Sequence, residues 1–104
     1  MNNISYSPEF SDVDNDGYVS GPVSVTNVAI EAKVGANRLA NREGITITNN
    51  GPNTVYYGPS GVTTSTGDLL YKNQFVTLPL GENIGVFLIC ATAQTATVIV
   101  QELA

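Results

Sequence analysis

Turn-forming residues divide the chain from Val23 onward into short runs that favour β-structure. Clusters of Gly, Pro, Asn, Asp and Ser, such as residues 49–53 and 58–61, separate the runs and impose backbone angles that a strand cannot continue. The repeat, roughly every 8–12 residues, is typical of sandwiches and barrels. It predicts an all-β fold: a single small antiparallel β-sandwich or jelly-roll-like barrel of about eight short strands. The expected strands are residues 23–30, 44–48, 54–57, 62–64, 69–71, 74–80, 84–91 and 96–103.

The first 22 residues differ in composition from the rest of the 104-residue chain. They contain four acidic residues and no basic one, and they are interrupted by Pro and Gly. Such a segment buries too little apolar surface to offset the entropy lost on ordering. We therefore expect an acidic, extended N-terminal arm over residues 1–22 and one β-sandwich domain over residues 23–104, since a chain of this length supports a single core.

The turn residues also suggest how strands are connected. Asn and Gly tolerate positive φ angles, so residues 49–53 are expected to form a hairpin loop. Residues 81–83 and 92–95 are short enough to join the last three strands into a meander.

The composition argues against catalysis. The chain has no His, which excludes hydrolytic mechanisms that use imidazole as a base or a zinc ligand within this chain. No nucleophile is paired with a base in any motif, so we expect no enzyme and no cofactor. The net charge of −5 and the four scattered basic residues also argue against a nucleic-acid partner.

Cys90 is the single cysteine, so no disulfide can form within the chain, and its apolar neighbours indicate an inert buried thiol. The first twenty residues hold no Lys or Arg and no apolar run, and no later stretch has the length of a membrane span. We therefore expect a chain that is made in a cytoplasm, is not secreted by a signal peptide and has no membrane partner.

Two late runs are apolar at every position: residues 86–90 and 98–100. A strand with one face on the core and one in water should alternate, so both faces of these strands need cover. Either the arm caps the second face or another copy of the chain buries it, and an exposed apolar face favours the second copy. We expect a homo-oligomer, a trimer in the favoured form, with interface residues Val86, Leu88, Cys90, Val98, Ile99 and Val100.

The acidic segment of the arm allows two interpretations. Asp12, Asp14 and Asp16 have the spacing of the first half of a calcium loop, but the position that should carry a bidentate Glu is Val23. A solvated acidic turn explains the segment as well, so calcium is a weak candidate. We expect the arm to dock on a basic groove of a neighbouring subunit, with Tyr6, Phe10 and Tyr18 as apolar anchors and Asp12, Asp14 and Asp16 setting the register.

Other side chains have simpler expected roles. Alternation places one of Tyr56 and Tyr57 in the core and the other over a sheet edge. Arg38 and Arg42 are expected to pair with Glu31 or Glu43 on the surface.

Three segments in order, residues 42–51 (REGITITNNG), 54–58 (TVYYG) and 62–67 (VTTSTG), resemble small accessory virion proteins of tailed bacteriophages. The resemblance covers about residues 38–103 and leaves the arm unmatched. It implies a β-sandwich structural module on the virion head or tail, with no catalytic residues. We therefore expect a non-enzymatic virion protein on the capsid surface. Its expected role is that of a capsid decoration (cement) or head-fibre-base protein. Its partners would be copies of itself and the major capsid protein or other virion subunits. The alternative is a tail-associated or receptor-binding module that recognises a host glycan.

Overall fold

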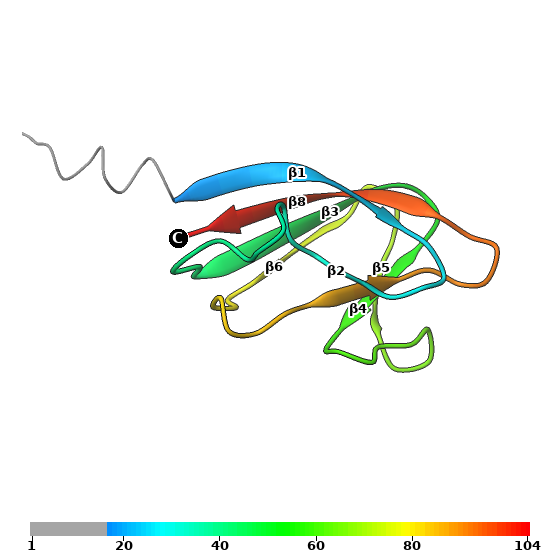
Figure 1. The fold of residues 1–104 in the computed structure, drawn as a ribbon. Coiled ribbons are helices and arrows are strands. Elements are labelled where there is room, and N and C mark those ends of the chain that lie inside the picture. Colours follow the sequence, from blue (N-terminus) through cyan, green and yellow to red (C-terminus); the bar gives the residue numbers. More distant parts are fainter. Residues whose placement is uncertain (1–16) are drawn as a thin grey trace, which may run out of the picture.

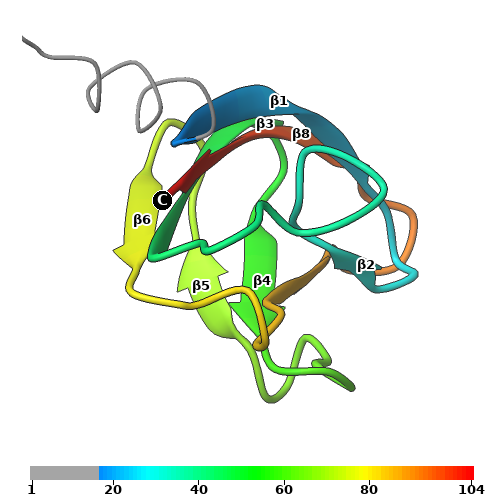
Figure 2. The same ribbon diagram turned by 60° about the vertical axis from the view of Figure 1, so that its left-hand side comes forward.

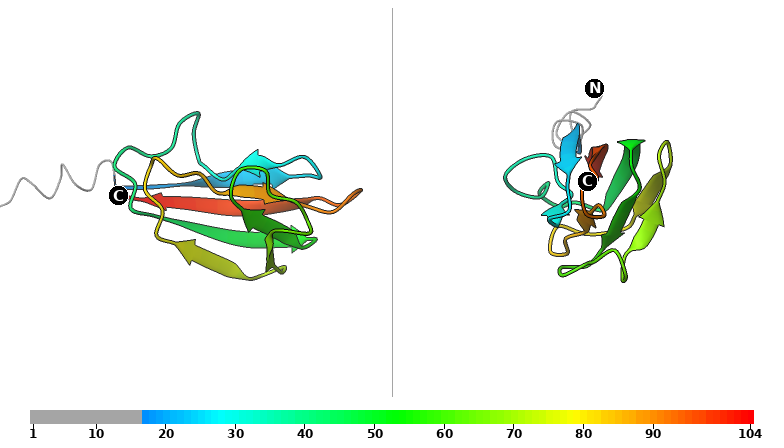
Figure 3. Two further views of the ribbon diagram at one scale, coloured as in Figure 1. Left: turned by 90° about the horizontal axis from the view of Figure 1, so that it is seen from below. Right: turned by 90° about the vertical axis from the view of Figure 1, so that its right-hand side faces the viewer.

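The computed structural model describes residues 17–104, which form two four-stranded β-sheets packed face to face (Figures 1 and 3). Within this range no helix is present. The strands are β1 (Tyr18–Val25), β2 (Ile30–Glu31), β3 (Gly44–Pro52), β4 (Val55–Gly58), β5 (Asp68–Leu70), β6 (Phe75–Leu78), β7 (Phe87–Ile89) and β8 (Ala96–Leu103). The predicted all-β sandwich of about eight short strands is confirmed.

Sheet A has the strand order β1-β8-β3-β6 and sheet B the order β2-β7-β4-β5, with every pair antiparallel. Among the described strands, only β4 and β5 are neighbours both in sequence and in a sheet. β6, β7 and β8 alternate between the sheets, so the expected meander is wrong. The expected hairpin over residues 49–53 is wrong too, because this segment carries the chain from sheet A into sheet B.

A buried Asn holds that crossover in place. The Asn49 side-chain amide donates to the carbonyl oxygens of Asn53 and Leu70, each at 2.9 Å, and its Oδ1 accepts the Gly51 N–H at 2.7 Å. Residues 49–52, expected as a loop, are the irregular end of β3, and the chain leaves sheet A only after Pro52.

The core lies between the sheets, and alternation determines which side chains enter it. On β3, Ile45 and Ile47 are fully buried while Thr46 and Thr48 are only partly covered. β8 behaves in the same way, with Val98 and Val100 inside. Figure 3 shows the strands of sheet A side by side in one view and the two layers end-on in the other.

Several expected boundaries differ from the structure. Residues 23–30, expected as one strand, are divided between the end of β1 and the start of β2, and β3 continues to Pro52 instead of ending at residue 48. β1 begins at Tyr18, so residues 18–22, assigned to the arm, form the first half of a strand that pairs with β8. Pro22 is tolerated there because β1 is an edge strand and its outer side needs no N–H. Residues 62–64, expected as a strand, belong to the loop between β4 and β5, where Val62 is buried.

An ion pair is buried at the end of the sandwich near the C-terminus. Arg42 Nη1 donates to Glu102 Oε2 at 2.7 Å, and both side chains are essentially inaccessible to water. Arg38 does pair with Glu31, as expected. The surface partner expected for Arg42 is wrong, because the antiparallel pairing of β3 with β8 brings Glu102 beside the start of β3.

Candidate interaction surfaces

The six residues predicted to form an oligomer interface do not share one surface. Val86, Leu88, Cys90, Val98 and Val100 point into the core of this chain, with exposed fractions of 3% or less. Only Ile99 lies on an outer face, and it is partly exposed. The strands do alternate, but apolar residues occupy the outward positions as well, which hid the alternation in the sequence. An interface on these strands would use their outward residues.

The outer face of sheet B carries an apolar patch formed by Tyr56, Leu69, Phe87 and Ile89. Tyr56 is paired with Ile89 on one side and with Leu69 on the other, so the three side chains form a row across β7, β4 and β5. Phe87 lies two residues from Ile89 on the same face. Leu69 is 49% exposed, and the other three are partly buried. This apolar patch replaces the predicted residues as the surface that a second copy could cover.

The outer face of sheet A, here called the polar face, is formed by the outward residues of β1, β8, β3 and β6. One row across the sheet consists of Pro22, Ile99, Thr48 and Phe75. The next consists of Ser20, Gln101, Thr46 and Thr77, in which the two threonine hydroxyls lie 2.9 Å apart. At the C-terminal end of β8, Gln101 donates to the Tyr18 hydroxyl at 2.8 Å.

None of the outward positions of these four strands carries a charge. They are residues 18, 20, 22 and 24 on β1, residues 44, 46, 48 and 50 on β3, residues 75 and 77 on β6, and residues 97, 99, 101 and 103 on β8. A broad sheet face rich in Ser and Thr can meet another protein surface without burying an unpaired charge.

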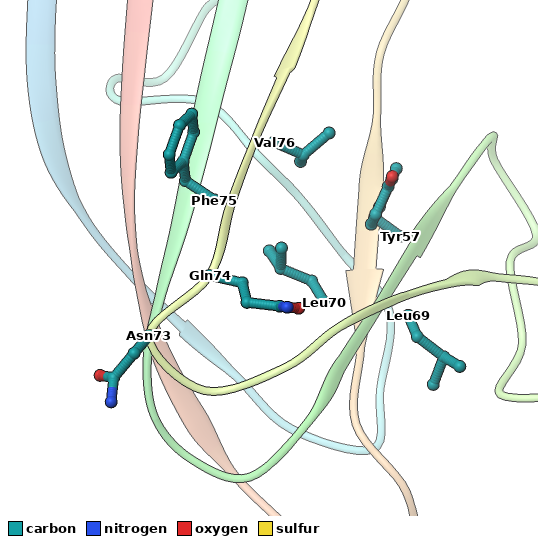
Figure 4. Close-up of a pocket in the computed structure, with 7 residues that line it drawn as sticks. All are labelled: Tyr57, Leu69, Leu70, Asn73, Gln74, Phe75 and Val76. Atoms are coloured by element: carbon teal, nitrogen blue, oxygen red, sulfur yellow. The ribbon is translucent and has the colours of Figure 1, made fainter.

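The third surface is a groove at the side of the sandwich (Figure 4). It lies where β5 and β6, the edge strands of the two sheets, come next to each other (Figure 2). The groove has a volume of about 410 Å³. Leu70, Val76 and Tyr57 point into it, whereas Phe75 and Leu69 point away at its margins (Figure 4). A second cavity of about 230 Å³ continues on the other side of Tyr57, toward Leu78 and Leu80. We call the two together the edge groove.

Tyr57 separates the two parts of the edge groove, since it lines both. Its side chain packs against the core, whereas Tyr56 belongs to the outer face. One tyrosine of the pair is directed inward, as expected, but Tyr56 lies in the middle of the outer face and not at a sheet edge.

Several ionisable groups of the described chain are engaged in contacts within the fold. Glu102 accepts the backbone N–H groups of Val34 and Leu39 at 3.0 and 3.2 Å in addition to Arg42. The hydrogen bond to Glu31 raises the pKa of Arg38, whose side chain is partly exposed. Burial raises the pKa of the Cys90 thiol, which keeps it in the unreactive protonated form.

Residues 17–104 contain no group of three or more side chains suited to hold a metal ion. The calcium candidates Asp12, Asp14 and Asp16, and the predicted anchors Tyr6 and Phe10, lie outside the described residues. Tyr18, the third predicted anchor, begins β1 and is 57% exposed. In the part of the chain that is described, no helix is long and apolar enough to cross a membrane.

Comparison with models of known protein families and with curated proteins gives no match for this chain.

Proposed function

We propose that this protein is a non-enzymatic structural component of a bacteriophage virion, as a capsid decoration (cement) or head-fibre-base protein on the capsid surface. The observation that carries the proposal is the polar face: a four-stranded surface with no charge at any outward position. It is combined here with the phage-like order of segments in residues 38–103. Such a face suits stable contact with coat subunits, because burying it against a neighbouring protein leaves no charged side chain without a partner.

The apolar patch supports association of the protein with copies of itself. Its row of Tyr56, Leu69 and Ile89 spans three strands, and aromatic and aliphatic side chains of this kind dominate the centres of protein interfaces. In this proposal the copies meet through the apolar patch in a homo-oligomer, with a trimer as the favoured form, and the polar face remains available for the coat.

The proposal is tested on particles that lack the protein, to which purified chain is added back. Thr48→Lys places a charge at the centre of the polar face, between Ile99 and Phe75, and is expected to abolish co-sedimentation with the particles. Thr64→Lys is the matched control, because it makes the same change at an exposed loop position away from the face. Equal binding of the Thr48→Lys variant and the wild type would remove the polar face as the contact. Mass spectrometry of purified virions that did not detect the chain would refute the virion role.

The glycan-binding alternative has less support. The second part of the edge groove is mainly apolar, and in the first part, whose lining is as polar as it is apolar, the Gln74 Oε1 atom already accepts the Tyr71 N–H at 3.0 Å. A sugar site would need several free polar groups converging on the ligand.

A further inference from the structure

The edge of β6 and the edge groove beside it together form a place for one more strand. We propose that residues 4–10 of a second copy of this chain add to β6 as a fifth strand of sheet A and fill the edge groove with their apolar side chains. This inference goes beyond the virion role and does not depend on it, because it concerns only how two copies of the chain combine.

The backbone of β6 defines where such a strand would bond. The Asn49 N–H donates to the Gln74 carbonyl at 2.9 Å, which fixes the residues of β6 that turn toward β3. Backbone groups in an antiparallel ladder alternate in direction from one residue to the next. Val76 and Leu78 therefore bond to β3, and Phe75 and Thr77 turn their N–H and C=O groups to the open edge.

The edge groove provides the side-chain half of the site. A strand added beside β6 places every second side chain between the two sheets, where Leu70, Val76 and Tyr57 converge (Figure 4). The two parts of the edge groove follow each other along β6, so successive inward side chains would enter one part and then the other. Backbone bonds along an edge combined with pockets for alternate side chains are the two components of recognition by strand addition.

Residues 4–10 of the arm have the required pattern. Ile4, Tyr6, Pro8 and Phe10 are apolar or cyclic, and the residues between them are Ser5, Ser7 and Glu9. With the first set inward, the second set continues the Ser- and Thr-rich polar face of sheet A.

Pro8 favours the arrangement with Ile4, Tyr6, Pro8 and Phe10 inward over the one with Ser5, Ser7 and Glu9 inward. Residues that share one face of a strand also turn their backbone groups to the same side. The inward side chains of β6 belong to residues that bond to β3, so inward residues of the added strand turn their backbone groups away from β6. The missing N–H of Pro8 then costs no ladder bond, and Ser5, Ser7 and Glu9 face the free groups of Phe75 and Thr77.

Charge and position favour an antiparallel strand from a second copy. In that direction the acidic residues that follow Phe10 continue past Phe75 toward Lys72, which precedes β6 and makes no ion pair within residues 17–104. In the parallel direction they would run toward Glu82 instead.

The start of β1 lies at the wrong end of sheet A for residues 4–10 of the same chain to add to β6 in this direction. Tyr18 is aligned with Leu103 and Gly44, at the end of sheet A where β6 finishes and three strands away from it. Leu69 lies both at the margin of the edge groove and in the apolar patch, so a neighbour seated on the patch is next to the groove.

The test is amide hydrogen exchange of the full chain at Phe75 and Thr77, whose N–H groups only the added strand would protect. Wild type is expected to show protection at both amides. Tyr6→Asp, which puts a charge in the apolar groove, is expected to lose it. Ser5→Asp is the matched control, because its side chain faces water and protection should persist.

Mixing then identifies the source of the strand. Isotope-labelled Tyr6→Asp chain is refolded with an excess of unlabelled wild type, and protection of the labelled Phe75 and Thr77 amides should return because wild-type arms now occupy the variant's groove. Protection in wild type without recovery on mixing would mean that each arm binds its own chain, and would overturn the proposal. Unprotected amides in wild type, or protection that Tyr6→Asp leaves unchanged, would overturn it as well. No virion particle enters this experiment, so its failure leaves the proposed function to its own test.

Discussion

Replacing Glu102 by Gln is the most informative test of how the sandwich is held together. Glu102 is fully buried on the inner face of β8, where its two carboxylate oxygens accept hydrogen bonds from Arg42, Val34 and Leu39. Arg42 in turn donates to the carbonyl oxygens of Leu80, at 3.2 Å, and Gly81, at 3.1 Å. The pair therefore ties the segments before β3 and before β7 to the last strand.

The expected cost follows from the burial of both ions. Removing one partner of a buried pair typically costs about 3–5 kcal/mol, because the other charge stays buried without compensation. Glu102→Gln keeps the shape of the side chain, but the amide NH₂ then faces N–H donors of Arg42, Val34 or Leu39. A chain of this size has roughly 5–15 kcal/mol of stability in total, so the variant should be marginal. At about 4–8 °C per kcal/mol, the melting temperature should fall by about 12 °C or more.

Urea denaturation followed by circular dichroism measures the effect. Glu31→Gln is the matched control, because it removes the carboxylate of the partly exposed Arg38 pair and should cost clearly less. The double variant Arg42→Met with Glu102→Met should recover part of the loss, since no charge is then left buried. A cost below about 1 kcal/mol for Glu102→Gln would refute the reasoning, because that is the value of a solvated pair.

Three further predictions follow from single positions. Burial raises the pKa of Cys90, so the folded chain keeps its proton to higher pH than the unfolded chain does. The free energy of unfolding should therefore decrease as the pH rises above about 8.5, and the urea midpoint of Cys90→Ala should not show this decrease. A thiol reagent should modify Cys90 slowly in the native chain. Asn49→Ala should cost about 1–3 kcal/mol by urea denaturation, because the buried Gly51 N–H loses its acceptor; a neutral result would contradict the role given to the crossover. Phe87→Asp should reduce the mass measured by light scattering while the fold persists, and Leu88→Asp should unfold the chain; equal outcomes would contradict the assignment of inner and outer faces.

Local patterns in the sequence were sufficient for the fold class. The alternation of Ile45 and Ile47 with Thr46 and Thr48 predicts a half-buried strand, and β3 has that form. The cluster at residues 49–53 predicts a change of direction; residues 49–52 still belong to β3, and the chain passes to sheet B directly after them. These signals are reliable because they depend on the φ and ψ preferences and side-chain periodicity of adjacent residues.

The arrangement of the strands required contacts between distant residues. The turn after β3 leads into the opposite sheet, because the buried Asn49 bonds to Leu70 on β5 rather than to a hairpin partner. Phe87 and Ile89 are as apolar as the buried Leu88 between them, so the sequence could not tell which of them faces outward.

The surfaces and the buried ion pair likewise depend on the whole fold. Arg42 finds Glu102 only because β3 and β8 pair antiparallel, and the polar face exists only because four strands far apart in the chain align their outward residues. The sequence by itself determined that short strands alternate with turns and which residues on a strand such as β3 face the core, since those follow from local backbone preferences and side-chain periodicity. The tertiary structure alone decided which strands pair and which side chains share a surface, because that choice minimises the free energy of the whole packed chain and no single segment contains it.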